Sequence, residues 1–506
     1  MTLASLKEIR DFDAKERMHR LYASLESALK WHQPRDYSAF VAQKLALAFE
    51  KPELLARYRP HHALHSVEAN CAFSNQRFCD GVKNEHLDHV MNLYHEHQDP
   101  MHSGLLNDEK LDHFFLVMHR EQMEVQYAAS RNEMARYQAL FLADEPIPKL
   151  ANTMQRERGI SVGSWIATCY FAVTAADQSP EKVFHKSVFS ASPQYGVSEN
   201  EVEQFLSQSS VSPREIRDRF VGLREKTKPQ FHSQIRSVFL EYPLIRLEDD
   251  FYVSPHPPLL LRHSGQGLYK TLKGFPYFGN EFGETVCRFI CKLLASLEEY
   301  EHLLTSSDLE RYSPGKSCDF LVEFEDVILL VESKATSFVA ERLVDSAILN
   351  DGSTTKIAKG IEQLHTTAYD VRSETFAKLG IDAKKEVIGV VATFGEIPFA
   401  NSDWYRKSFI EKRAESRLAE PIFPSENMTQ WPIVMSLESV EHLVATLNSF
   451  DSGLNDLVKE KDAKPYIQVG DWDRFLVSKM SEDPTRVQSI PFLLEYERAF
   501  LERFRD

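Results

Sequence analysis

The stretch CDFLVEFEDVILLVESKAT, from Cys318 to Thr336, contains two apolar runs separated by Glu325-Asp326. Both runs are rich in Val, Leu, Ile and Phe, a composition that favours β-strands. One acid lies near the start of the first run, and Glu-Ser-Lys ends the second. Charges within strands are costly unless they are paired or coordinate a metal. The stretch therefore predicts a β-hairpin with a candidate functional site at its open end.

The register of this hairpin brings three charged side chains together. With the turn centred on Glu325-Asp326, Asp319 lies opposite Glu332, because facing residues of an antiparallel pair have positions with a constant sum. Lys334 shares the face of Glu332, since strand residues two apart point the same way. Facing carboxylates repel each other. A divalent cation such as Mg²⁺ removes that conflict by taking both as oxygen ligands.

A lysine beside such a cation has a clear chemical use. Lys334 can orient the attacking water or stabilise the charge that develops on a phosphate, which predicts metal-assisted phosphodiester hydrolysis. The turn is the weak part of the prediction. Glu-Asp is a poor two-residue hairpin turn because neither residue favours a positive φ. A longer loop with the same centre keeps the same register.

Helices and further strands surround the hairpin in the sequence. A helix is predicted from Gly279, with one apolar face made by Phe282, Val286, Phe289, Ile290, Leu293 and Leu297. Another helix is predicted over residues 356–380 and a strand over 385–395. The order helix, strand, strand, helix, strand indicates a mixed α/β core.

This arrangement resembles the PD-(D/E)xK nuclease superfamily, which has the restriction-endonuclease-like fold. The resemblance covers residues 278–395 and rests on Asp319 followed by Glu332-x-Lys334 at the end of an apolar strand. The superfamily's Pro-Asp is replaced by Cys318-Asp319 in this chain. The resemblance implies that Asp319 and Glu332 are metal ligands and that Lys334 is catalytic.

The flanking helices add two residues through the same resemblance. A Gly-Glu-x-x-Val pattern similar to that of NERD-type members supplies Glu284 as a third metal ligand, with Glu281 as the alternative. The helix after the Glu-x-Lys strand supplies Gln363, with Lys359 one turn before it, and Gln363 is expected to support the site.

The hydrophobic pattern along the chain divides it into three regions. Residues 1–240 predict an all-α domain for sensing, oligomerisation or substrate grip, and residues 401–506 predict a helical extension packed on the nuclease domain. Residues 241–400 form the predicted α/β nuclease core, a mixed β-sheet flanked by helices. In the first region, Ser212 and Pro213 predict a helix start as N-cap and first helical residue.

Composition places the protein among ordinary globular chains. Its 506 residues are 43% hydrophobic and 26% charged, with a net charge of -16, which argues against a surface that is basic throughout. The six cysteines form no CxxC pair, and no secretory signal is apparent, so we expect free thiols in the cytoplasm. The uncharged stretch 159–176 predicts a buried core helix in preference to a membrane span.

Other chemistries find weaker support in the sequence. Histidines are concentrated before residue 120, and Cys71 and Cys79 lie among them, but no zinc-finger or HExxH spacing occurs. Neither a Gly-x-Ser-x-Gly nucleophile motif nor a phosphate-binding P-loop is present.

The resemblance thus implies an endonuclease dependent on Mg²⁺ or Mn²⁺ that cuts DNA. Similarity of the flanks to defence-associated members implies an anti-phage role, a phage-derived trigger and a homo-oligomer, with no membrane partner. The alternatives are an RNase of the same fold, an interaction module that binds without cutting, and solvated strand ends with no function.

Overall fold

The computed structural model divides the chain into two compact units. Unit 1 comprises residues 1–133 and 148–275, and unit 2 comprises 134–147 and 276–506. The chain therefore passes between the units after residues 133, 147 and 275. The residues described are 3–75, 81–97, 132–141, 148–227, 232, 235–313, 315–337, 352–397, 400–411, 428, 430–450, 452–463 and 472–502.

Unit 1 is mainly helical. Its helices are α1 (Leu3–Leu29), α2 (Pro34–Glu50), α3 (Pro52–Leu55), α4 (Pro60–Phe73), α5 (Asn84–His97), α9 (Pro148–Arg158), α10 (Val162–Gln178), α11 (Glu199–Ser209), α12 (Pro213–Lys226), α13 (Pro258–Arg262) and α14 (Leu268–Lys273). Leu21, Leu25, Tyr37, Leu64 and Tyr94 belong to one fully buried cluster. The predicted start of α12 is confirmed: Ser212 and Glu215 form a capping box, and Pro213 is the first helical residue.

A small sheet makes unit 1 differ from the predicted all-α domain. The strands β1 (Val183–His185), β2 (Ser210–Val211), β3 (Leu244–Arg246) and β4 (Phe251–Val253) pair in the order β1-β4-β3-β2. β3 and β4 lie within the range 241–400 that was predicted as the nuclease core, but they belong to unit 1. β1 and β2 are too short to show the two-residue alternation by which a strand is recognised.

The uncharged stretch predicted as a core helix forms most of α10. Trp165 is buried and donates a hydrogen bond from its indole nitrogen to the carbonyl of His263 at 3.2 Å. It also packs edge-on against Phe205, with ring centroids 5.3 Å apart. Of the described helices, none by itself has the length and apolarity of a membrane span; only the bent pair Asn152–Arg158 and Val162–Gln178 meets that criterion jointly.

Unit 2 is built on a five-stranded mixed sheet in the order β5-β6-β7-β8-β9. The strands are β5 (His302–Thr305), β6 (Phe320–Glu323), β7 (Val327–Lys334), β8 (Glu386–Thr393) and β9 (Ile433–Ser436). β5, β6 and β7 pair antiparallel, whereas β7, β8 and β9 pair parallel. The carboxyl ends of the three parallel strands lie side by side, with Lys334, Thr393 and Ser436 in register.

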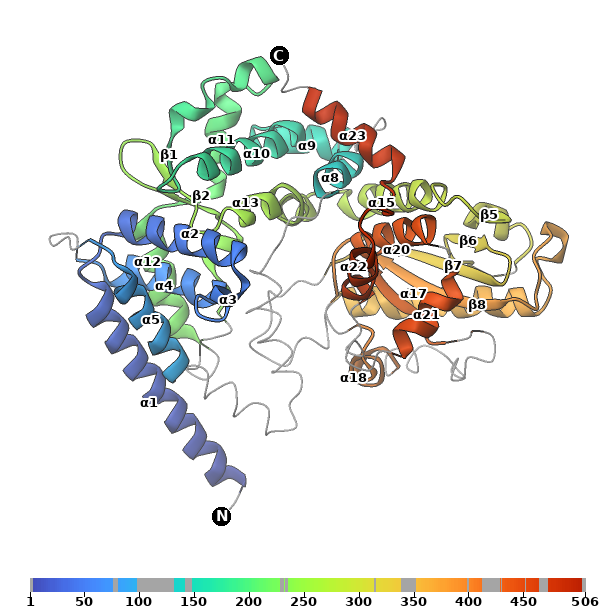
Figure 1. Cartoon of the computed structure of the whole chain (residues 1–506), viewed down its shortest axis with the longest axis horizontal. Coiled ribbons are helices and arrows are strands. Elements are labelled where there is room, and N and C mark those ends of the chain that lie inside the picture. Colours follow the sequence, from blue (N-terminus) through green and yellow to red (C-terminus); the bar gives the residue numbers. More distant parts are fainter. Residues whose placement is uncertain are drawn as a thin grey trace. The chain divides into compact units, whose positions relative to one another are not determined.

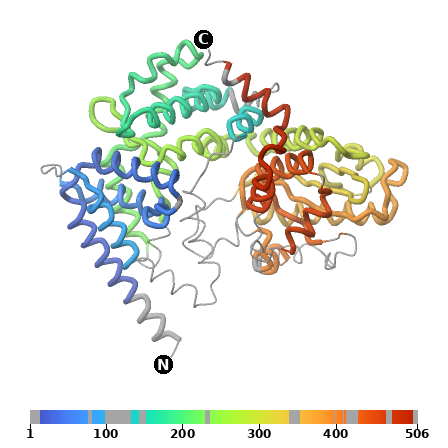
Figure 2. The backbone as a smooth tube through the Cα atoms, in the orientation of Figure 1, coloured from blue at the N-terminus to red at the C-terminus, as the bar shows by residue number. Residues whose placement is uncertain are grey.

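Helices cover both faces of this sheet, as Figures 1 and 2 show. Helix α17 (Gly352–Arg372) packs on β7 and β8 over one face, where Ile328, Leu330 and Val391 are buried. Helices α15 (Phe278–Leu294) and α20 (Leu437–Ser449) cover the other face. Because strand side chains alternate, Glu332 and Lys334 point toward α17, and Ser333 points toward α15.

The remaining helices of unit 2 are α8 (Glu133–Phe141), α16 (Ser306–Leu309), α18 (Asp403–Tyr405), α21 (Leu454–Asp462), α22 (Trp472–Glu482) and α23 (Pro491–Glu502). The apolar face predicted for α15 is confirmed for Phe282, Val286, Phe289, Ile290 and Leu293, which are buried; Leu297 is also buried but lies beyond the end of the helix. The region after residue 400, predicted as helical, also contributes β9 to the sheet. A mixed sheet flanked by helices is thus the architecture of unit 2.

Candidate functional site

The predicted hairpin register is confirmed. Phe320 pairs with Val331, and Glu323 pairs with Ile328. The turn is short: the amide of Phe324 donates to the carbonyl of Val327 at 2.9 Å, so only Glu325 and Asp326 connect the strands. Neither turn residue has a positive φ. The turn therefore avoids the positive φ angles that Glu and Asp disfavour.

Asp319 lies directly opposite Glu332, one position before β6 begins. The Asp319 amide donates to a carboxylate oxygen of Glu332 at 3.1 Å. The Asp319 carboxylate itself turns toward Ser333, accepting hydrogen bonds from the backbone amide at 2.7 Å and from the hydroxyl. The two acids are therefore neighbours, but their carboxylates are held by different partners.

Lys334 completes the group at the carboxyl end of β7. Its ammonium forms an ion pair with Glu332 and donates to the side-chain oxygen of Gln363 on α17 at 3.0 Å. The Gln363 amide group in turn donates to the carbonyl of Ser317 at 3.4 Å. Because Glu332 is 2% exposed and the Lys334 side chain 14%, this ion pair is largely removed from water. The structure thus brings Glu332, Lys334 and Gln363 into direct contact beside Asp319.

Helix α17 holds this group by a close approach at Gly360. A methyl group at position 360 would lie 3.2 Å from the Lys334 Cε and 3.3 Å from the Glu332 Cγ. The same helix fixes the chain just before Asp319, because the Thr367 hydroxyl accepts a hydrogen bond from the Cys318 amide at 2.8 Å. The sequence analysis did not identify Gly360, although a glycine within a helix is a signal of close packing.

The environment of Glu332 disfavours its charged form. Burial raises the pKa of Glu332 to about 7, and the nearby negative charge of Asp319 adds to this rise. Lys334 opposes the rise through its ion pair, and the exposed Lys316 does so more weakly. A carboxylate perturbed in this way by burial and a specific neighbour is typical of functional sites.

Helix α15 presents a cysteine to the two acids. Burial raises the pKa of the Cys287 thiol to about 12. The nearby negative charges of Asp319 and Glu332 add to this rise. Glu284 lies one turn earlier and is exposed, and Glu281 is half-buried two turns before Cys287. Among the described residues, neither glutamate joins Asp319 and Glu332 in a compact group of three ligands. From the sequence, Cys287 was expected only to be one of six free thiols.

A different group in the described part of unit 2 has the spacing of metal ligands. Glu301, His302 and Glu323 offer ligand atoms that all lie within 4.8 Å of one another. These residues lie at the opposite end of β6 from Asp319. Lys385 is also present: its ammonium contacts Glu301 and approaches a carboxylate oxygen of Glu323 at 3.1 Å. Glu323 is therefore already neutralised by an ammonium in this structure.

Among the residues that the structure describes, the histidine-rich region before residue 120 contains no group with the spacing of metal ligands. Cys79, His102, His113 and His119 lie outside the described residues. The described cysteines, Cys71, Cys169, Cys287, Cys291 and Cys318, are all free thiols.

Neither a protein-family model, nor a curated protein, nor a solved structure matches this chain.

Proposed function

We propose that this chain is a metal-dependent nuclease that hydrolyses phosphodiester bonds of DNA at the site formed by Asp319, Glu332, Lys334 and Gln363. One observation carries the proposal. A buried Glu332–Lys334 ion pair, held by Gln363, lies at the edge where the parallel strands end, directly beside a second acid. The carboxyl ends of parallel strands are the usual location of ligand sites in α/β folds.

The donor set fits a hard divalent cation. Asp319, one position before β6, and Glu332 on β7 supply carboxylate oxygens, which are the ligands that Mg²⁺ prefers. Burial first, and the negative charge of Asp319 second, raise the pKa of Glu332, and a bound cation would oppose both effects. Mg²⁺ or Mn²⁺ held by these oxygens would polarise the scissile phosphate and lower the pKa of a bound water. Glu284 remains the proposed third ligand, from one turn before Cys287 on α15.

Lys334 and Gln363 have complementary roles in this proposal. The ammonium of Lys334 is an electrophilic group that stabilises negative charge on a phosphate oxygen or holds the attacking water. Gln363 accepts a hydrogen bond from that ammonium and donates to the Ser317 carbonyl, so it fixes the direction of the lysine. Gln363 is therefore a positioning residue.

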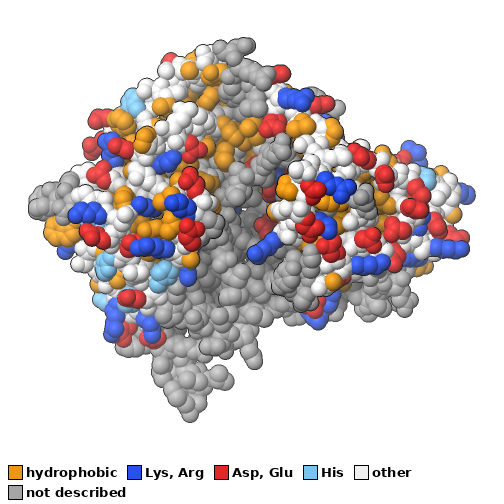
Figure 3. Space-filling view, viewed as in Figure 1, with side chains coloured by type: hydrophobic (Ala, Val, Ile, Leu, Met, Phe, Trp, Pro, Cys, Tyr) orange, Lys and Arg blue, Asp and Glu red, His pale blue; other side chains and the backbone are white. Residues whose placement is uncertain are grey.

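Exposed lysines near the site suit a polyanionic substrate. Lys316 precedes Asp319, and Lys356 and Lys359 lie on the first turns of α17; all three are exposed. On the face that Figure 3 shows, lysines and arginines are mixed with acids. Phosphate contacts by a few local lysines are sufficient to hold DNA in spite of a net charge of -16. A cytoplasmic anti-phage role, a phage-derived trigger and a homo-oligomer belong to the same proposal by analogy alone.

The test is cleavage of supercoiled plasmid with Mg²⁺ or Mn²⁺, with EDTA as the metal-free control. Lys334→Met is expected to abolish cleavage. Lys479→Met is the matched control, since Lys479 has nearly the same side-chain exposure, 15%, and also pairs with acids in unit 2. Equal cleavage by the two variants would refute the assignment of Lys334.

Two further arms separate the alternatives. Transfer RNA and messenger RNA, offered in the same buffer, identify an RNase if they are cut in preference to DNA. An extract of phage-infected cells supplies a trigger if the purified protein is inactive alone. A parent protein that binds DNA yet cuts neither nucleic acid under any of these conditions would be an interaction module.

A further inference from the structure

Helix α8 occupies an unusual place in the chain. It belongs to unit 2 from residue 134 onward, yet residues 1–133 before it and 148–275 after it belong to unit 1. Its buried side chains include Ala135, Arg136, Tyr137, Leu140 and Phe141. A segment of the nuclease unit is therefore encoded within the sequence of the other unit.

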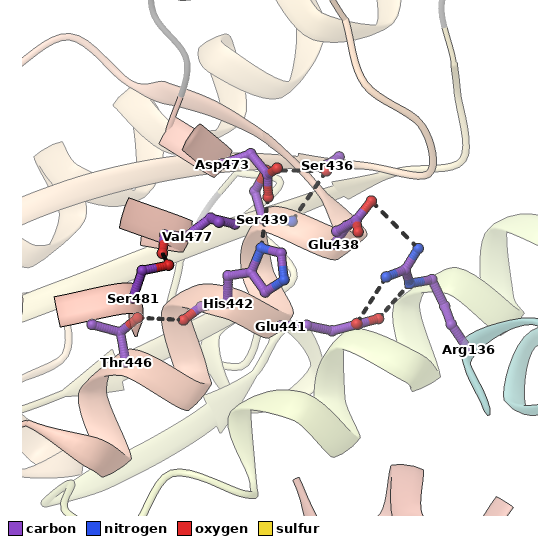
Figure 4. A network of polar contacts seen from close by, with 10 residues as sticks. All are labelled: Arg136, Ser436, Glu438, Ser439, Glu441, His442, Thr446, Asp473, Val477 and Ser481. Carbon is purple, nitrogen blue, oxygen red and sulfur yellow. Dashed lines mark hydrogen bonds and ion pairs between the residues drawn. The ribbon is translucent and has the colours of Figure 1, made fainter. Parts of the chain in front are cut away.

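A buried ion pair anchors α8 to α20 (Figure 4). Arg136 donates from two of its nitrogens to the two carboxylate oxygens of Glu441, at 2.5 and 2.9 Å. Glu438, one turn earlier, approaches a third nitrogen at 3.8 Å. The Arg136 side chain is 6% exposed and that of Glu441 0%. Such a fork-to-fork pair has a single geometry, so it fixes where α8 lies on α20.

The other side of α20 is fixed by α22. The ring of His442 is hydrogen-bonded through Nδ1 to Asp473 at 2.7 Å. Burial lowers the pKa of His442, but the bond to Asp473 and the nearby Glu438 and Glu441 more than offset it, so that the pKa is raised. Helix α20 is thus held between two segments that are distant in the sequence.

An aromatic series then connects α8 to the candidate site. Phe141 stacks on Phe282 of α15, with centroids 5.4 Å apart and rings inclined by 19°. Phe282 packs edge-on against Phe394, with centroids 5.0 Å apart. The amide of Phe394 donates to the carbonyl of Lys334 at 3.2 Å. All three rings are buried.

We propose that α8 is a positioning element of the candidate site: through Phe141 and Phe282 its docking fixes the strand end that presents Lys334. This inference rests on the proposed nuclease function for its effect on activity. Helix α15, which carries Phe282, also packs on β7.

Core packing explains why the loss of the Phe141 ring should displace Lys334. Well-packed cores transmit small displacements instead of absorbing them. A displacement of about 1 Å at a catalytic group is enough to lower a rate on the order of 100-fold. The support of Lys334 is backbone geometry, so its loss should lower kcat and leave KM nearly unchanged.

The test compares Phe141→Ala with Phe492→Ala in the full-length protein. Phe492 of α23 also packs on α15, against Phe289 at 5.7 Å, but it is not part of the series that leads to Lys334. The expected result is a fall in kcat on the order of 10-fold to 100-fold for Phe141→Ala alone. Phe141→Leu, which keeps an apolar side chain, should restore part of it.

Hydrogen exchange supplies a readout that does not depend on cleavage. The amides of residues 331–337 and 390–396 should exchange faster in Phe141→Ala than in Phe492→Ala. Equal exchange and equal kcat in the two variants would overturn the inference while the nuclease proposal stands. Faster exchange in Phe141→Ala, with no cleavage by the parent protein, would support the packing role and count against the nuclease proposal.

Discussion

Gly360 of α17 lies directly against the side chain of Glu332. A methyl group at position 360 would stand 3.3 Å from the Glu332 Cγ and 3.2 Å from the Lys334 Cε. The helix can approach the strand closely because this position lacks a side chain. The same approach brings Gln363, one turn later, within hydrogen-bonding distance of Lys334. The geometry of the candidate site therefore depends on a residue that carries no functional group.

Gly360→Ala should separate activity from stability. Alanine favours a helix by about 0.5–1 kcal/mol over glycine, which offsets the cost of the tight contacts, so the melting temperature should change little. The added methyl group should displace Lys334 and lower cleavage on the order of 10-fold or more. Gly222→Ala in α12 is the control, because an added methyl group has no neighbour within 4 Å there. Unchanged cleavage by Gly360→Ala would show that the close approach is not needed.

Glu441→Gln should destabilise unit 2 strongly. It leaves Arg136 buried without its charged partner, which costs about 3–5 kcal/mol in comparable buried pairs. Glu438→Gln is the matched control: Glu438 also approaches Arg136, but at 3.8 Å and with its side chain 32% exposed. Its expected cost is below about 1 kcal/mol. Urea unfolding of both variants measures the difference, and similar losses for the two would contradict the central role of Glu441.

The pH dependence of stability should change in Glu68→Gln. Burial raises the pKa of Glu68 to about 7 in the folded protein, from an ordinary value of 4.5, despite hydrogen bonds from Ser237 and Val238. The folded state then holds a proton that the unfolded state has lost, so this group makes stability fall as pH rises from about 4.5 to about 7.

The predicted contribution is about 3 kcal/mol over that interval. It is measured as the difference between parent and Glu68→Gln in the free energy of unfolding at pH 5 and pH 7. A difference that stays constant across the interval would show that Glu68 is ionised in the folded protein at both values.

Lys385→Met should turn the Glu301, His302 and Glu323 group into a metal site. In the parent, the ammonium neutralises Glu323, so EDTA should not change the melting temperature. The variant removes the ammonium beside the buried Glu323, which keeps only its hydrogen bonds with His302 and the Asp382 amide among the contacts described, and should lose about 3–5 kcal/mol. Zn²⁺ should restore much of that loss, since carboxylate and imidazole are its common ligands. The double variant Lys385→Met, Glu323→Gln should show no such recovery, and a zinc response in the parent would contradict the role given to Lys385.

The sequence predicted the hairpin well because its signals are local. The alternating faces and the two-residue turn fix the register, so Asp319 opposite Glu332 and Lys334 beside it could be predicted from spacing alone. The apolar face of α15 was equally clear, since five buried residues recur at helical spacing within it. The family resemblance implied only that Gln363 supports the site, and its hydrogen bond with Lys334 is a finding of the structure.

The parts that the sequence did not predict depend on tertiary context. β5 and β9 are four-residue strands whose pairing is decided by their neighbours in the sheet. The direction of the Asp319 carboxylate, toward Ser333, follows from competition among hydrogen-bond donors at the strand end. The assignment of α8 to unit 2 has no local signal, because Arg136 and Glu441 are far apart in the chain.

The interleaving of the two units also limits how this gene can be rearranged. Residues 276–506 do not encode the whole of unit 2, because α8 is supplied by codons that lie between two parts of unit 1. A fragment beginning at residue 276 would expose Phe282 and leave the Glu441 carboxylate without its guanidinium. Recombination therefore cannot transfer this unit as one contiguous cassette, and the two units are expected to be inherited together.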